Sequence, residues 1–253
     1  MGIEFSQTPQ VFGGLHLALL TGIAAMLFAL FFVLRRREEK QLRALIVGLG
    51  ILMLVMEVWK QWFVPRYVYP GVLSFWFFPW QLCSMAMYVS AALGFVRGRA
   101  EEAILVFLSS FNIVAALGAL IFPYDMMRPQ IYLFIHSFLY HALMLVESMA
   151  AMMILAKRKK ASFLPALWMY LGMAVVAEVV NVISHLVAAS VRKEANMFNI
   201  TPFYPSTQPV FHEIAVTIGI LPEILIYLGF IALLSYGIYR LFYGIKKKRT
   251  GEG

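Results

Sequence analysis

The side chains of this sequence that could do chemistry lie within or at the edges of stretches that are otherwise apolar. They are a single cysteine, four histidines, several carboxylates, a lysine and amides: His16, Glu57, Lys60, Gln81, Cys83, Asn112, His136, His141, Glu147, Glu178, Asn181, His185 and Glu223. An ionisable side chain at membrane depth costs about 3 kcal/mol on insertion scales. Because so many are present, we expect a polar interior, and we expect the functional site to lie there.

Cys83 is the strongest nucleophile of this set. A thiol reacts as its thiolate, so Cys83 would need a nearby imidazole or another polarising group. Gln81, His136, His141 and His185 are the candidates. His136 and His141 are five residues apart, about 140° around a helix, so they could flank a cavity. They lack the four-residue spacing of a two-histidine zinc clamp.

The remaining polar residues recur at helical spacing. Glu178, Asn181 and His185 are separated by three and then four residues, which places them on one helix face. Glu57 and Lys60 are one turn apart, and we favour an internal ion pair for them. His16 is expected near the outer end of the first span, and Glu223 about ten residues into the seventh, with Asn112 at a similar depth. Pro79 and Pro222 each predict a kink in a membrane helix.

Each of these residues also has a purely structural interpretation. A lone histidine in a helical bundle usually joins two helices through a hydrogen bond. A buried cysteine behaves as a small hydrophobic residue. The shared location of the polar groups is therefore stronger evidence for a site than any single residue.

The elements that must position these residues are membrane helices. Hydrophobic residues make up 62% of the 253 residues and charged residues 13%, which indicates an integral membrane protein. We predict an all-α fold, one polytopic domain over residues 1–253, with a bundle of seven transmembrane helices. The predicted spans are about 12–34, 41–64, 71–96, 102–123, 130–156, 162–190 and 212–243. The first lacks the features of a cleaved signal peptide and is expected to remain as a helix.

The basic residues predict the orientation of this bundle. Sixteen Lys and Arg residues follow the first, third, fifth and seventh spans, against five on the other side. The positive-inside rule then places the N-terminus outside or in a lumen and the C-terminus in the cytosol. The polar groups of at least five spans fall in the outer half, which predicts a cavity open to that side. The expected location is the plasma membrane of a prokaryote or, in a eukaryote, the endoplasmic reticulum.

One outer connection, residues 191–212, is long and contains Pro202, Pro205 and Pro209. Such prolines exclude a regular helix. Long loops in compact proteins are often lids or binding segments. A solvated connector with interfacial aromatic residues is the equal alternative.

The segment from Phe78 to Met85 resembles a known signature. Its sequence, Phe-Pro-Trp-Gln-Leu-Cys-Ser-Met, is similar to the Pro-Leu-His-Leu-Cys-Ser motif of the YwaF-like bacterial membrane proteins and of their eukaryotic relatives, the transmembrane-protein-164 family. The seven-span layout, His16, the histidines of the fifth span and an outer loop with Asn199 and Pro205 also resemble that family. Gln81 stands where the family usually has histidine.

The resemblance implies a membrane acyltransferase acting on phospholipids. In that case Cys83 would take the acyl chain as a thioester, with His141, or alternatively His136, as the base. A transporter or receptor-like binder of a small or amphipathic ligand is a second hypothesis. A zinc-dependent lipid hydrolase using His136, His141, His185 and a carboxylate is a third.

The partners expected are membrane lipids. The basic residues lie in short clusters between apolar spans, so we expect no nucleic-acid binding. A single cysteine excludes a multi-cysteine metal site. We expect no cofactor and no bound metal under the first hypothesis, and a homo-oligomer is an open alternative.

Overall fold

The computed structural model describes residues 3–70, 74–158, 161–187 and 194–249 of the chain. Every named element in these ranges is helical, and an isolated bridge between Glu4 and Gln130 is the β pairing that they contain. The all-α prediction is confirmed. Six helices in the described residues are long and apolar enough to cross a membrane.

The long helices follow the predicted stretches closely. They are α1 (Gly14–Leu34), α2 (Glu39–Phe63), α4 (Arg99–Ser109) with α5 (Phe111–Ile121), α6 (Ile131–Lys157), α7 (Phe163–Leu186) and α9 (Ile220–Arg249). The pair α4 and α5 forms one pass that is interrupted at Ser110, and a π-helical turn, Val64–Val68, extends α2.

The third predicted span is the main correction to the sequence analysis. Its described residues, 74–96, do not form one long helix: a 3₁₀ turn at Phe75–Phe77 and another at Leu82–Ser84 precede the short helix α3 (Met85–Ala92). Pro79 explains the break, because proline lacks an N–H and forces the preceding residue out of the helical region. Phe78 is accordingly extended, with ψ of 133°.

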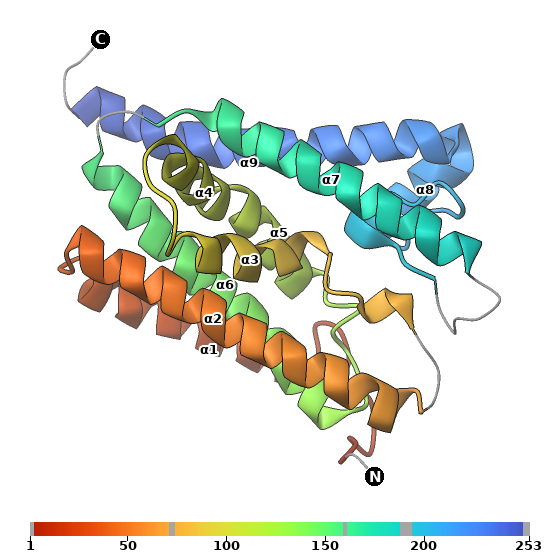
Figure 1. Cartoon of the computed structure of the whole chain (residues 1–253). Helices are drawn as coiled ribbons and strands as arrows, with labels where there is room; N and C mark the ends of the chain where they lie inside the picture. Colours follow the sequence, from red (N-terminus) through yellow and green to blue (C-terminus); the bar gives the residue numbers. More distant parts are fainter. Residues whose placement is uncertain (1–2, 71–73, 159–160, 188–193, 250–253) are drawn as a thin grey trace.

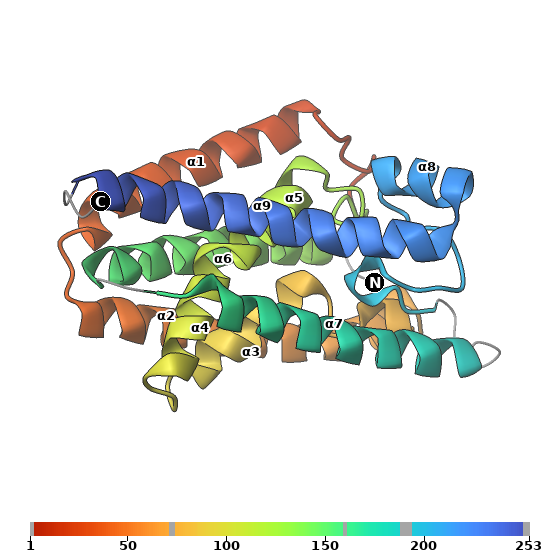
Figure 2. The ribbon, with the colours of Figure 1, turned by 90° about the horizontal axis from the view of Figure 1, so that it is seen from above.

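The last predicted span, 212–243, is also divided. Gly219, with φ of 100°, ends the short helix α8 (Pro209–Ile218), and α9 begins at the next residue. The two helices fold back on each other, and α8 lies along the start of α9 (Figure 2). Pro222 therefore lies in the first turn of α9, where its missing N–H costs nothing, and not at a kink inside a helix.

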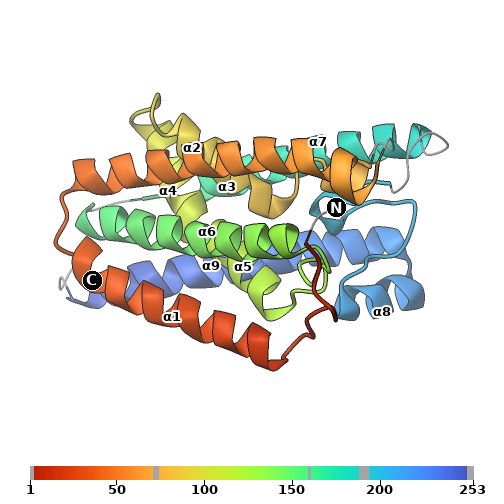
Figure 3. The same cartoon turned by 90° about the horizontal axis from the view of Figure 1, so that it is seen from below.

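The most buried helix, α6, forms the centre of the bundle. Helices α1 and α2 pack on it and flank it in Figure 3, and α7 and α9 lie on the far side of the molecule from them, with α3, α4 and α5 between (Figure 1). Helices α2 and α3 approach very closely: a Cβ atom at Gly50 would lie 2.6 Å from the backbone N of Ala91. Glycine is thus required where α3 meets α2.

Charged residues hold together one end of the bundle, and we call this end the closed end. Glu101 is buried at the start of α4 and accepts from Arg43 at 3.2 Å and from Arg158 at 2.7 Å. Arg43 also donates to the carbonyls of Leu93 and Val96 just after α3. The closed end therefore joins α2, α3, α4 and the end of α6 through one network.

Candidate functional site

A cavity of about 590 Å³ lies toward the opposite end of the bundle, where α2 ends and α6 begins. Its walls come from α2, from the interrupted third span (residues 75–92, called the broken segment), from α5 and α6, from the segment 194–208 before α8, and from α8 and α9. Six of the predicted site residues line it: Glu57, Lys60, Gln81, Cys83, His136 and His141. Their helices thus bring together residues from positions 57 to 141 of the chain.

Cys83 lies on the wall of this cavity because the third span is broken. The 3₁₀ turn Leu82–Ser84 closes with a hydrogen bond from the Ser84 N–H to the Gln81 carbonyl, 2.8 Å. Leu82 and Ser84 are buried on either side, whereas Cys83 is half-buried. All three residues of the turn line the cavity, and Cys83 is the most accessible of them.

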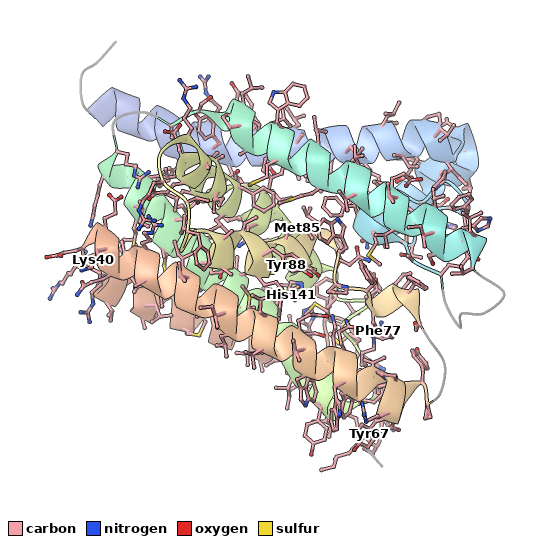
Figure 4. All side chains as sticks on the ribbon, viewed as in Figure 1. Lys40, Tyr67, Phe77, Met85, Tyr88 and His141 are labelled. Atoms are coloured by element: carbon pink, nitrogen blue, oxygen red, sulfur yellow. The ribbon has the colours of Figure 1, made fainter. Side chains whose placement is uncertain are left out.

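His141 has one ring nitrogen fixed and the other open. Its Nδ1 lies 2.7 Å from the Ser137 carbonyl, which can only accept, so Nδ1 carries the proton. Its Nε2 is buried and has no hydrogen-bond partner among the described residues. The ring lies inside the bundle (Figure 4) and lines the cavity. The fixed tautomer leaves an Nε2 lone pair that can accept a proton.

His136 is held differently on the same wall. Its Nε2 donates to the Met56 carbonyl at 3.2 Å, and the ring stacks between Trp59 and Tyr140, with centroid distances of 5.7 and 5.9 Å. The imidazole therefore ties α6 to α2. His141 is the better placed of the two histidines to act as a base.

Two tyrosines that were not among the predicted site residues also line the cavity. The Tyr140 hydroxyl is buried and has no partner in the described part of the chain, and the Tyr227 hydroxyl accepts from Asn199 at 3.4 Å. Helical spacing could have found Tyr140, because it follows His136 by four residues on the same face of α6. No comparable signal marks Tyr227.

Glu57 and Lys60 form the ion pair that the sequence favours, with 2.8 Å between Lys60 Nζ and Glu57 Oε2. Gln61 donates from one amide nitrogen to Glu57 and to the Phe77 carbonyl, each at 2.6 Å. The pair and Gln61 therefore hold the broken segment against α2. The two charges cancel, so this part of the wall is polar without being strongly charged.

Gln81 clamps the segment 194–201 against the broken segment. Its amide nitrogen donates to the Asn196 carbonyl at 3.0 Å, and its amide oxygen accepts from the Phe198 N–H at 3.1 Å. Asn181 exchanges two further hydrogen bonds with the backbone of Met197, at 2.6 and 3.2 Å. Gln81, at the position where the family usually has histidine, therefore has a structural role in this chain.

The segment 194–201 is inserted into the bundle. Phe198 is 1% exposed and packs near Tyr170, and both Phe198 and Asn199 have φ of 57°, unusual for residues other than glycine. Both residues also line the cavity. The segment 194–201 is therefore packed into the bundle, with Phe198 and Asn199 on the cavity wall, and is not a solvated connector. Residues 191–193 lie outside the described residues.

Six predicted site residues do not line this cavity: His16, Asn112, Glu178, Asn181, His185 and Glu223. His16 is buried with both ring nitrogens bonded, accepting from the Phe12 N–H at 3.0 Å and donating to the Leu120 carbonyl at 2.9 Å. Asn112 donates to the Met144 carbonyl and the Ser148 hydroxyl, both at 3.0 Å, and so joins α5 to α6.

The other residues of this group lie toward the same end but outside the cavity. Glu178 accepts from Asn181 at 3.2 Å. His185 is exposed, lies 2.9 Å from Glu194 and stacks on Phe203 at 3.7 Å. Glu223 is buried, with Oε1 lacking a partner among the described residues. The buried polar residues therefore divide into one group that lines the cavity and others that lie at separate positions outside it.

The zinc hypothesis lacks its ligand set in this arrangement. Within the described ranges there is no group of three or more His, Cys, Asp or Glu side chains placed to hold a metal ion. His185, one of the proposed ligands, is bound to Glu194 outside the cavity.

Comparison with known proteins gives one family. The model of the TMEM164 family matches residues 11–243, which covers α1 to nearly the end of α9. No curated protein and no solved structure matches the chain.

Proposed function

The chain belongs to the TMEM164 family of multi-pass membrane proteins, and from this premise we propose that it is a lipid acyltransferase that carries an acyl chain on Cys83. One observation carries the proposal. A lone cysteine and a histidine with an open Nε2 line one largely apolar cavity within a membrane bundle. A nucleophile and a base beside apolar walls are what thioester chemistry on a lipid requires.

The topology that goes with this proposal has seven passes. The broken segment 75–92 runs between α2 and α4 and would be the seventh, beside the six long helices. The start of α1 and the end of α9 lie at opposite ends of the bundle, which an odd number of passes requires (Figures 1 and 2). The basic residues then place the closed end in the cytosol and the cavity toward the outer leaflet or lumen.

The first half-reaction forms the thioester. Cys83 Sγ attacks the carbonyl carbon of a phospholipid ester while its proton passes to His141 Nε2. The ester C–O bond then breaks, and the leaving lysophospholipid oxygen takes the proton from His141. The Tyr140 hydroxyl is available to donate to the carbonyl oxygen as negative charge develops on it.

The second half-reaction returns the enzyme to its starting state. A hydroxyl of an acceptor lipid gives its proton to His141 Nε2 as its oxygen attacks the thioester carbon. The C–S bond breaks, and the Cys83 sulfur recovers the proton from His141. The acyl group has moved from one lipid oxygen to another, with no oxidant, reductant or nucleotide consumed.

Acyl-thioester capture tests this proposal directly. Purified protein incubated with a phospholipid that carries an alkyne-tagged acyl chain should acquire a tag that hydroxylamine removes. Since Cys83 is the only cysteine, any thioester must be at that position. Cys83→Ala should lose the tag, and Cys83→Ser, of similar size, should either lose it or hold it in a hydroxylamine-resistant ester. A wild-type protein that stays unlabelled would contradict the proposal.

Binding without chemistry is the second candidate function, and the broken third span favours it. Non-helical backbone at membrane depth occurs where it lines a cavity, as in many transporters. Here Phe78 and Gln81 lie in such backbone and line the cavity. A binder predicts ligand-dependent thermal stabilisation that survives Cys83→Ala and is lost in Glu57→Gln. An acyltransferase predicts turnover that Cys83→Ala abolishes.

A further inference from the structure

We infer that the acyl chain lies in a slot between α5 and α9 that opens sideways to the membrane, with Gly118 setting the width of the slot. The inference rests on the proposed function for the identity of the occupant. It concerns the apolar part of the cavity, away from Cys83 and the histidines.

Two facing stripes of residues form the slot. On α5 the cavity-lining residues Val114, Gly118 and Ile121 recur at intervals of three or four. On α9, Tyr227, Ile231, Leu234 and Ile238 do the same. Residues at this spacing share one helix face. The apolar walls therefore run along both helices and start from the polar part of the cavity, where Cys83 lies.

The length of the slot matches one leaflet. From Tyr227 to Ile238 the helix advances by eleven residues, which at 1.5 Å per residue is about 16 Å. The hydrocarbon core of a bilayer is about 30 Å thick, so one leaflet contributes roughly half of that. A single extended acyl chain of a membrane lipid is thus the ligand that fits this length and polarity.

The slot is open on its side. Leu117, Ile121, Phe230 and Leu234 line the cavity and are nevertheless 42–44% exposed. In Figure 2, α5 is seen between α9 and α1. A chain could therefore enter from the bilayer while its ester carbonyl approaches Cys83, without the lipid leaving the membrane.

An aromatic stack lies one turn before the first cavity-lining residue of α5. Phe111 lies one turn before Val114 on α5 and is fully buried. Its ring stacks on Tyr170 at 4.7 Å and on Phe163 at 5.5 Å. A stack at this position would limit the length of chain that the slot accepts.

Gly118 is the residue through which the slot can be tested. A Cβ atom added to Gly118 would meet no other atom within 4 Å. A large side chain there would fill the slot without displacing the backbone. Gly172 on α7 offers a matched control, since its Cβ would also meet nothing within 4 Å and it lies outside the cavity.

The experiment is photolabelling with a phospholipid that carries a diazirine near the end of one acyl chain. It is carried out on full-length Cys83→Ala protein, so that labelling does not depend on thioester formation. We expect adducts on the stripe residues Leu234 and Ile238 in preference to the outward-facing Leu233 and Leu241, which are 68% exposed. Unlabelled phospholipid should compete for the stripe adducts only.

Gly118→Phe should reduce the stripe labelling at least tenfold, and Gly172→Phe should leave it unchanged. In the protein with Cys83 intact, Gly118→Phe should suppress thioester formation from long acyl chains more than from an eight-carbon chain. Equal, non-saturable labelling of stripe and outward residues would overturn the slot even if Cys83 forms a thioester. Saturable stripe labelling without any thioester would keep the slot and reject the acyltransferase.

Discussion

The two ends of the bundle use buried polar residues in opposite ways. At the closed end, Glu101 satisfies both Arg43 and Arg158, and the charges hold four elements together. At the cavity end, the His141 Nε2 and the Tyr140 hydroxyl are buried without a partner among the described residues. A buried polar atom without a partner costs about 1–3 kcal/mol. The cavity end therefore holds two polar atoms that a molecule in the cavity can bond.

The same contrast is found between two histidines of the chain. His16 and His141 both lie inside apolar helices, and both are nearly inaccessible. His16 uses both ring nitrogens to join Phe12 and Leu120, whereas His141 uses one. Residue type and burial are therefore alike for these two histidines. They differ in the number of satisfied ring nitrogens, and the proposed role of His141 as a base depends on that difference.

The comparison of the two histidines gives the largest expected effect. His141→Asn keeps a donor in reach of the Ser137 carbonyl and removes the open nitrogen. We expect it to lower the rate of thioester formation by about 10²–10⁴-fold, the usual contribution of a general base. The thermal unfolding temperature should change little.

His16→Asn should give the reverse result. It removes the hydrogen bond to Leu120 and should cost about 1–3 kcal/mol of stability, with the thioester rate per folded molecule unchanged. Acyl-thioester capture and thermal unfolding in detergent, measured on both variants, check the pair. If both substitutions affect rate and stability alike, the distinction between the two histidines is wrong.

Glu101→Ala should give the next largest effect, on stability alone. It leaves Arg43 and Arg158 without their shared carboxylate, and removing one partner of a buried pair costs about 3 kcal/mol or more. For a chain of this size that corresponds to a fall in melting temperature of roughly 6–12 °C. Thermal unfolding monitored by size-exclusion chromatography measures it.

Glu213→Ala is the control for this prediction, because Glu213 is exposed on α8. An exposed substitution should change stability by no more than about 0.5 kcal/mol. Competition for the stripe adducts by unlabelled phospholipid should be retained in Glu101→Ala. Loss of that competition with an unchanged melting temperature would mean that the closed end communicates with the cavity.

The sequence was sufficient for the long helices and insufficient for their interruptions. Apolar length located five of the long passes to within four residues at each end, because hydrophobicity and length decide membrane insertion, whereas α9 begins eight residues after the start of its predicted span. The effect of Pro79 was predicted as a kink, whereas the chain leaves the helix entirely between Phe78 and Gln81. The end of α8 at Gly219 could not be predicted, because this glycine lies in a continuous apolar stretch. Whether a proline bends or ends a helix depends on neighbours that can satisfy the freed backbone, and these are tertiary contacts.

The candidate site was predictable in part for the same reason. Depth along each span indicated Cys83, His136 and His141 together, since membrane helices run in register between two surfaces. Rotation about each helix axis was not predictable, and it places His16 and Asn112 away from the cavity. The inserted segment with Phe198 came from a loop whose burial depends on the amides of Gln81 and Asn181.

That clamp yields the smallest of the expected effects, and it tests whether the inserted segment is a separate unit at the cavity end. Gln81→Ala removes two hydrogen bonds to the segment 194–201, each worth about 1 kcal/mol. The left-handed backbone of Phe198 and Asn199 is itself unfavourable and favours release once the clamp is lost. Amide hydrogens of residues 195–201 should exchange about 30-fold faster, since 1.4 kcal/mol is a factor of ten.

Gln61→Ala is the control, because it frees the Phe77 carbonyl instead and should leave the exchange of these amides unchanged. Amides around the Glu38–Gln41 cap at the closed end should also be unchanged. Faster exchange throughout the chain would instead mean that both ends unfold together.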